Sequence, residues 1–243
     1  MVKTLALILK KQNLGETDRI LTILTPALGK KRVVARGVRK PLSKLSGHLD
    51  SLMVSQIIIT DKPELPQVTS AVLVESFENA RENLELLNYC YAVGKLALRL
   101  AQDDEPQQSL FQATVDAFAR VDVGSGPAGV WLYYLAQLSK MYGVYVTEFR
   151  CGSCGEKISE DAHFNLEDRR LYHLEHAPPA RARRLGANSV KLLQLLHGKP
   201  FTMIQRIRIP EETARELEEI LLIELAENYA NAPWKQYARL ARD

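Results

Sequence analysis

The stretch Gly29-Lys-Lys-Arg-Val-Val-Ala-Arg-Gly-Val-Arg-Lys-Pro-Leu-Ser-Lys44 decides how the N-terminal part of the chain folds. Residues 31–36 have the length and apolar centre of a β-strand, and Gly37 and Pro41 then open a loop. Because alternate side chains of a strand point to the same face, the stretch predicts a strip of cations that runs from a sheet face into the loop. Lys30, Arg32 and Arg36 share one face, Arg39, Lys40 and Lys44 lie in the loop, and Lys31 completes the set of cations that we expect to bind a polyanion.

Short apolar runs closed by turn residues recur on both sides of this stretch. Asn-Leu-Gly at 13–15, Pro26 and a proline-containing turn at 61–66 separate them. Five such runs in the first 75 residues predict a small closed or nearly closed β-barrel. An OB-fold and an SH3-like barrel both satisfy this spacing. The expected strands cover residues 4–10, 19–25, 31–36, 52–60 and 68–74.

From residue 77 the apolar spacing becomes that of helices. The expected helices cover residues 84–98, 110–121, 131–141, 189–196 and 211–229. We interpret Glu211, Glu212, Glu216, Glu218 and Glu219 as a solvated face of the last helix. The chain is therefore expected to be an α+β protein, with an N-terminal OB-fold barrel in 1–76. An α-helical domain in 77–148 and 179–243 follows, and it contains a small zinc-ribbon-like insert at 149–178.

Charge is distributed unevenly along the chain. Residues 1–49 hold eleven lysines and arginines against Glu16 and Asp18, a balance of +9; since the whole chain carries +3, the remaining residues carry −6. Such asymmetry is typical of a polyanion-binding domain joined to a body with other duties, although a solvated basic face is the alternative. The first 75 residues contain no aromatic residue. We therefore expect contacts to phosphates to dominate over base stacking.

The insert carries a pattern of metal ligands. Cys151-Gly-Ser-Cys154 is followed, after eighteen residues, by His173-Leu-Glu-His176. This spacing is close to that of zinc ribbons, and four protein ligands would make a structural zinc site with no open position for a catalytic water. His163 is a competing ligand. A redox-active cysteine pair and a metal-free cysteine pair are the alternatives, and Cys90 is expected to be a buried small side chain.

Several functions are not indicated by the sequence. No glycine-rich loop ends in Lys-Ser or Lys-Thr, so no nucleoside triphosphate site is predicted, and we expect no enzymatic activity. No apolar run reaches the roughly 18–20 residues of a membrane span, and the N-terminus lacks a signal peptide. These features lead us to expect a cytoplasmic protein without a membrane partner.

Taken together, the sequence resembles the RecO family of bacterial recombination mediators. The resemblance lies in Ala6-Leu-Ile-Leu-Lys10, in Leu14-Gly-Glu-Thr-Asp18-Arg19, in Leu21-Thr-Ile-Leu-Thr25, in the stretch from Gly29 to Lys44, and in the Cys151-x2-Cys154-Gly knuckle. The resemblance implies an OB-fold, an α-helical domain and a zinc-binding insert. By position, Arg36, Arg39, Lys40 and Lys44 fall in the family's DNA-contacting region. Cys151 and Cys154 match its first metal pair, and His173 and His176 stand where many members have cysteine.

The resemblance also implies a function in recombinational DNA repair, with the protein associated with the nucleoid. Members of the family bind single- and double-stranded DNA and anneal complementary strands. They act with RecR in the RecFOR pathway, contact the C-terminal tail of single-stranded-DNA-binding protein (SSB), and help load RecA onto SSB-coated DNA. An OB-fold factor that binds RNA or the ribosome is the chief alternative. A zinc-dependent hydrolase is a second, and a closed four-ligand site argues against it.

Overall fold

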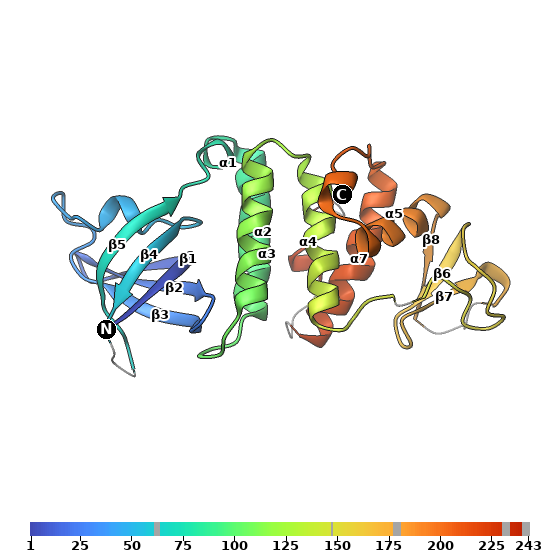
Figure 1. The fold of residues 1–243 in the computed structure, drawn as a ribbon, viewed down its shortest axis with the longest axis horizontal. Coiled ribbons are helices and arrows are strands. Elements are labelled where there is room, and N and C mark those ends of the chain that lie inside the picture. Colours follow the sequence, from blue (N-terminus) through green and yellow to red (C-terminus); the bar gives the residue numbers. More distant parts are fainter. Residues whose placement is uncertain (61–63, 147, 177–180, 230–233, 240–243) are drawn as a thin grey trace. The chain divides into compact units, whose positions relative to one another are not determined.

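The computed structural model describes residues 1–60, 64–146, 148–176, 181–229 and 234–239 (Figure 1). The chain forms two compact units, Met1–Val123 and Gly124–Asp243. The first unit contains the predicted barrel, and the second contains the predicted insert.

The barrel of the first unit is a five-stranded antiparallel sheet that closes on itself. Its strands are β1 (Val2–Leu14), β2 (Asp18–Thr25), β3 (Gly29–Ala35), β4 (Val54–Ile59) and β5 (Val68–Glu75). They lie in the order β3-β2-β1-β4-β5. The two outer strands meet where the Val34 N–H donates to the Pro66 carbonyl at 2.8 Å, beside a parallel bridge from Val34 to Gln67. This closure is that of an OB-fold. The predicted fold class is therefore confirmed, and the barrel is not of the SH3-like type.

Alternating side chains of the strands fill the barrel. Ile8, Leu21, Ile23, Val33 and Ala35 are among its fully buried residues. The five predicted strands are present, and β1 is longer than expected. Its polar second half, Lys10–Leu14, continues to pair with the start of β2 after a bulge. Sequence periodicity could not show this extension, because the added residues have no apolar alternation.

Three helices complete the first unit: α1 (Glu78–Glu82), α2 (Leu84–Leu100) and α3 (Gln108–Asp122). The loop between α2 and α3 is bound to the barrel, since the Lys30 N–H donates to the Gln102 carbonyl at 3.0 Å and the Gln107 N–H to the Pro26 carbonyl at 2.9 Å. The compact units therefore do not follow the expected division at residue 77. The helices before Val123 belong to the same unit as the barrel.

The second unit is built around α4 (Pro127–Met141) and α7 (Glu211–Asn228), with α5 (Ala187–Gly198) and α6 (Phe201–Ile204) beside them. Glu218 on α7 is fully buried and accepts a hydrogen bond from the Trp131 indole N–H at 2.6 Å. Glu216 accepts from the Ser189 hydroxyl at 2.5 Å. The interpretation of these two glutamates as a solvated face is therefore wrong. Among the described residues, no helix is long and apolar enough to cross a membrane.

A small three-stranded sheet forms the insert. Its strands are β6 (Ala162–Asn165), β7 (Arg170–His173) and β8 (Ala182–Leu185), in the order β7-β6-β8. Because β8 pairs with β6, the sheet continues beyond the expected end of the insert at residue 178. Short 3-10 helices occur at Ser46–His48, Leu174–His176 and Trp234–Gln236.

Candidate nucleic-acid interface and metal centre

The two lysines at the start of β3 have partners within the protein. The Lys30 ammonium donates to the Ala101 carbonyl at 2.8 Å and lies 3.5 Å from an Asp103 carboxylate oxygen. Lys31 forms an ion pair with Asp104. Both acids belong to the loop between α2 and α3, which runs beside this end of the strand. These contacts balance part of the positive charge that we expected to be available to a polyanion.

The close approach of this loop depends on Gly29. Its φ is +66°, and a Cβ atom built there would lie 2.1 Å from the Glu105 carbonyl oxygen. Any side chain would push the α2–α3 loop away, because the obstructing atoms belong to the backbone. Gly29 therefore holds the acidic loop against the lysines that follow it.

The remaining cations of the predicted strip are exposed. Arg32 projects from the middle of β3, and Arg36, Arg39, Lys40 and Lys44 lie in the loop after the strand. β3 is seven residues long, which places its two ends roughly 20 Å apart. The structure thus divides the predicted strip into a paired group at the start of β3 and an exposed group in the middle of the strand and beyond its end.

The loop after β3 is held in place by the turn between β1 and β2. The Gly37 N–H donates to the Asp18 carboxylate at 2.7 Å, and the Arg39 N–H donates to the Thr17 carbonyl at 3.0 Å. The Arg39 guanidinium also donates to the Gly15 carbonyl at 3.3 Å. The cations therefore project from a loop whose backbone is tied to the barrel.

Asp18 is an acid close to this exposed group. The Gly37 N–H, then the Thr17 hydroxyl, lower the pKa of its carboxyl below the ordinary value of 3.8 and outweigh the opposing effect of burial, and the charges of Arg36 and Lys40 lower it a little further. Asp18 is thus ionised near neutral pH. It fixes the loop through Gly37 and offsets one of several positive charges.

The strand register places a further cation, which the sequence analysis did not include, beside the end of β3. Arg19 on β2 pairs with Ala35, the residue before Arg36, and its side chain donates to Asn13 at 3.5 Å. The predicted strands at 19–25 and 31–36 contained the signal, because antiparallel pairing of neighbours in the sequence sets the start of one beside the end of the other.

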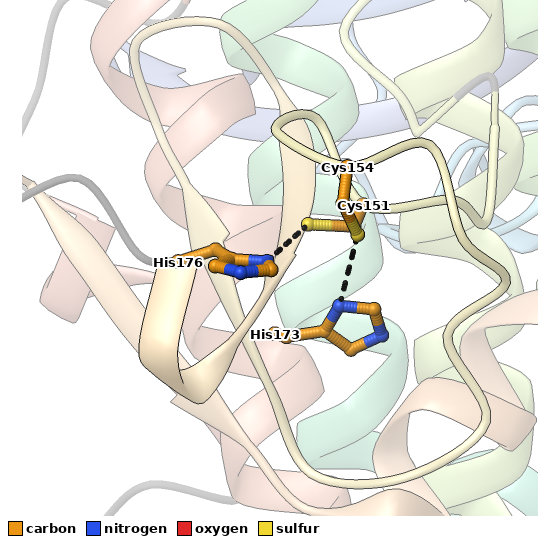
Figure 2. Close-up of side chains that lie close together, drawn as sticks. All are labelled: Cys151, Cys154, His173 and His176. Atoms are coloured by element: carbon orange, nitrogen blue, oxygen red, sulfur yellow. Dashed lines mark hydrogen bonds between the residues drawn. The ribbon is translucent and has the colours of Figure 1, made fainter.

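The structure brings Cys151, Cys154, His173 and His176 together (Figure 2). One ligand atom from each lies within 4.8 Å of the others. Cys151 Sγ is 3.6 Å from His176 Nδ1, and Cys154 Sγ is 3.5 Å from His173 Nδ1. Tetrahedral zinc with bonds of about 2.3 Å to sulfur and about 2.0–2.1 Å to nitrogen separates such atoms by about 3.5–3.6 Å. The donor set therefore fits a metal ion of this kind.

The knuckle and β7 are joined by backbone contacts. Cys151 forms a bridge with Leu171, and the Gly152 N–H donates to the Leu171 carbonyl at 2.8 Å. A Cβ atom at Gly152 would lie 2.6 Å from the ring of Tyr172, so the knuckle approaches β7 closely only because it has a glycine there. This pairing places the cysteine pair beside the histidine pair.

The environment of Cys151 favours its thiolate. Burial would raise the pKa of this thiol, but N–H groups of Cys154, His173 and Ser153, together with the His176 ring, lower it to about 6. A thiolate is the form that binds metal. His163 lies outside the four-residue cluster, and within the part of the chain that the structure describes its Nδ1 has no hydrogen-bond partner. Cys90 is buried on α2, and burial raises the pKa of its thiol to about 12.

An OB-fold with exposed cations, followed by helices and a Cys2His2 insert, defines the class of OB-fold nucleic-acid-binding proteins. Residues 1–77 match the family model described as "Recombination protein O N terminal", and residues 81–236 match "Recombination protein O C terminal". The chain belongs to the RecO family. This membership supports DNA binding and a role in DNA repair and recombination.

Curated relatives are similar over most of the chain. The "DNA repair protein RecO" of Dehalococcoides mccartyi is 32% identical over 225 residues, which cover 89% of this chain and 86% of that protein. The protein with the same description from Roseiflexus sp. is 28% identical over 221 residues, covering 90% and 78%. That of Salinibacter ruber is 25% identical over 226 residues, covering 91% and 85%.

Proposed function

We propose that the chain is a recombination mediator that binds single- and double-stranded DNA through the exposed cations of β3 and of the loop after it. It anneals complementary strands and, with RecR, helps load RecA onto SSB-coated DNA. The observation that carries this proposal is the exposed group made of Arg32 on β3 and of Arg36, Arg39, Lys40 and Lys44 on a loop anchored to the barrel.

Annealing follows from the chemistry of such a surface. Two DNA strands repel each other through their phosphates, and cations held on one protein surface reduce that repulsion. The barrel strands carry no aromatic side chain on which bases could stack, so the base edges stay free to pair. The same features predict binding that depends weakly on sequence and strongly on salt.

We infer a structural role for zinc in the insert. Cys151, Cys154, His173 and His176 would hold it, and their two thiolates would neutralise its charge. A zinc ion at this position cross-links the knuckle to β7 and the short helix after it, which stabilises the insert. With four protein ligands no coordination position remains for water, as expected of a structural zinc site.

Metal analysis of the purified protein tests this assignment. We expect about one zinc per chain in the parent and in a Cys90→Ala control, and none in Cys151→Ser/Cys154→Ser. His163→Ala should keep its zinc, because His163 lies outside the cluster. A parent protein purified without chelators that contains no zinc would contradict the assignment.

The protein partners follow from the family resemblance. We propose RecR and the C-terminal tail of SSB as partners, and a cytoplasmic, nucleoid-associated location. A pull-down with RecR, and a titration with the SSB tail peptide, would test them separately from DNA binding.

A strand-annealing assay tests the proposed function most directly. Arg36→Ala/Arg39→Ala/Lys40→Ala/Lys44→Ala should slow annealing at least about tenfold, because it removes most of the exposed phosphate contacts. Lys30→Ala/Lys31→Ala is the matched control, and it should anneal within about threefold of the parent rate, because these lysines are already paired. A folded fourfold variant that anneals at the parent rate would overturn the proposal.

A further inference from the structure

A cavity of about 460 Å³ lies beside the metal knuckle in the second unit. Residues 151–155 of the knuckle form one wall, and Glu148, Arg150, Arg169 and Arg170 complete it. Its size is within the roughly 300–1,000 Å³ of small-ligand sites. No apolar side chain other than the two cysteines lines it, and three arginines face one glutamate, so the cavity suits a polar anion.

Two of the arginines are held in position by the protein. The Arg150 guanidinium donates to the Gly155 carbonyl at 3.1 Å. Arg169 Nε donates at 2.9 Å to Glu224, whose side chain is 5% exposed. Each contact fixes one edge of a guanidinium and leaves further N–H groups on the same head. Positioned arginines lose less conformational freedom when they bind an anion.

The turn that carries the arginine pair is conformationally unusual. Arg169 has φ of +58°, a region that non-glycine residues rarely adopt. The Arg169 N–H donates to the Asn165 carbonyl at 3.0 Å and closes the turn before β7. Arg170 is exposed, and among the described residues its guanidinium forms no hydrogen bond or ion pair. Such backbone conformations are retained where the position of a side chain matters.

We propose that this cavity binds a phosphate group of single-stranded DNA, so that the second unit contacts a DNA strand independently of the barrel. Arginine presents a planar fork of N–H donors that matches two phosphate oxygens, and three such heads exceed the two opposing charges of Glu148 and of Glu224, which pairs with Arg169. A second contact of this kind would let one protein hold a strand at two places.

The lining favours phosphate over an acidic peptide. A peptide ending in apolar residues needs an apolar pocket beside its cations, and the walls of the cavity are arginine, glycine, serine, cysteine and glutamate. This inference rests on the proposed DNA-binding function, but it concerns a different set of residues. The two can therefore fail separately.

Binding of a labelled oligothymidine to the full-length protein tests the proposal. Arg170→Gln should weaken binding roughly fivefold near 0.1 M salt, the effect of losing about one phosphate contact to single-stranded DNA. Glu148→Gln should strengthen binding, because it removes the one acid at the cavity. Arg170→Gln, Arg150→Gln and Glu148→Gln are each made in the parent and in the background that lacks Arg36, Arg39, Lys40 and Lys44, called here the barrel variant. Zinc content and circular dichroism establish that each variant is folded.

The outcomes separate the two claims. Loss of affinity on Arg170→Gln in both backgrounds, with a gain on Glu148→Gln, supports the cavity. If neither Arg170→Gln nor Arg150→Gln changes the affinity for DNA in either background, the cavity proposal is overturned. The proposed function still stands in that case if the barrel variant binds DNA much more weakly than the parent. If the barrel variant binds like the parent and Arg170→Gln does not, the barrel interface is wrong and the cavity stands. If Arg170→Gln affects only the binding of an acidic peptide, phosphate is not the ligand.

Discussion

The two ends of β3 carry cations in opposite states. At the start, Lys30 and Lys31 are paired with Asp103 and Asp104, which come from the loop between two helices. Beyond the end, Arg36 and its neighbours project from a loop that is anchored to the barrel mainly through its backbone. Cations that lie close together in the sequence thus differ in whether they are available to bind a phosphate. The number of cations in a segment does not determine how many are available to DNA.

The largest effect is expected at the exposed end. Arg36→Ala/Arg39→Ala/Lys40→Ala/Lys44→Ala should weaken single-stranded DNA binding on the order of 600-fold near 0.1 M salt, since each of the four phosphate contacts contributes roughly fivefold there. Fluorescence anisotropy with an oligothymidine measures this loss. A change smaller than about fivefold in a folded variant would show that the two ends of β3 do not differ as we describe.

An intermediate effect of opposite sign is expected from the acidic loop. Asp103→Asn/Asp104→Asn should strengthen DNA binding roughly five- to twentyfold, because it releases two lysines for phosphate contacts. Asp116→Asn is the control, since it removes an acid that pairs with Arg120 on α3 and not with the barrel. Equal affinities of the double variant and the control would mean that the loop does not compete with DNA.

A small effect is expected from the paired lysines themselves. Lys30→Ala/Lys31→Ala should change the affinity for DNA by less than about threefold, because both lysines already form ion pairs with Asp103 and Asp104. The same change made together with Asp103→Asn/Asp104→Asn should remove the gain predicted for that variant. If the gain in affinity persists without the two lysines, its cause is that removing two negative charges reduces the overall repulsion of DNA.

The smallest effect is one on stability. The pKa of Asp18 is lowered in the folded protein, so its ionised form stabilises the fold above the ordinary value of 3.8, and this contribution is lost as pH falls below it. Asp18→Asn should therefore lower the Tm at pH 7, and the difference from the parent should shrink below about pH 4. A constant difference across this range in thermal unfolding would exclude the carboxylate charge as the cause.

The long elements could be predicted because their periodicity is strong. Five strands and the helices α2, α3, α4, α5 and α7 lie where apolar spacing placed them. The helices α1 and α6 and the strands β6, β7 and β8 have four or five residues each, too few to show a period. Short elements of this kind are set by tertiary contacts, which the sequence does not display.

The two candidate sites were predictable to different degrees. The four metal ligands come together because β7 pairs with the knuckle, so the spacing from Cys151 to His176 contained most of the information. The pairing of Lys30 could not be foreseen, because Ala101 and Asp103 lie more than seventy residues further along the chain. The burial of Glu218 beside Trp131 was hidden for the same reason.

The dependence of DNA affinity on salt concentration tests most directly whether the exposed cations hold phosphates. Log Kd for an oligothymidine is plotted against log salt for the parent and for the variant that lacks Arg36, Arg39, Lys40 and Lys44. Four lost contacts to single-stranded DNA should flatten the slope by roughly 3. Two parallel lines would contradict the account, because the four side chains would then make no contact with the DNA backbone.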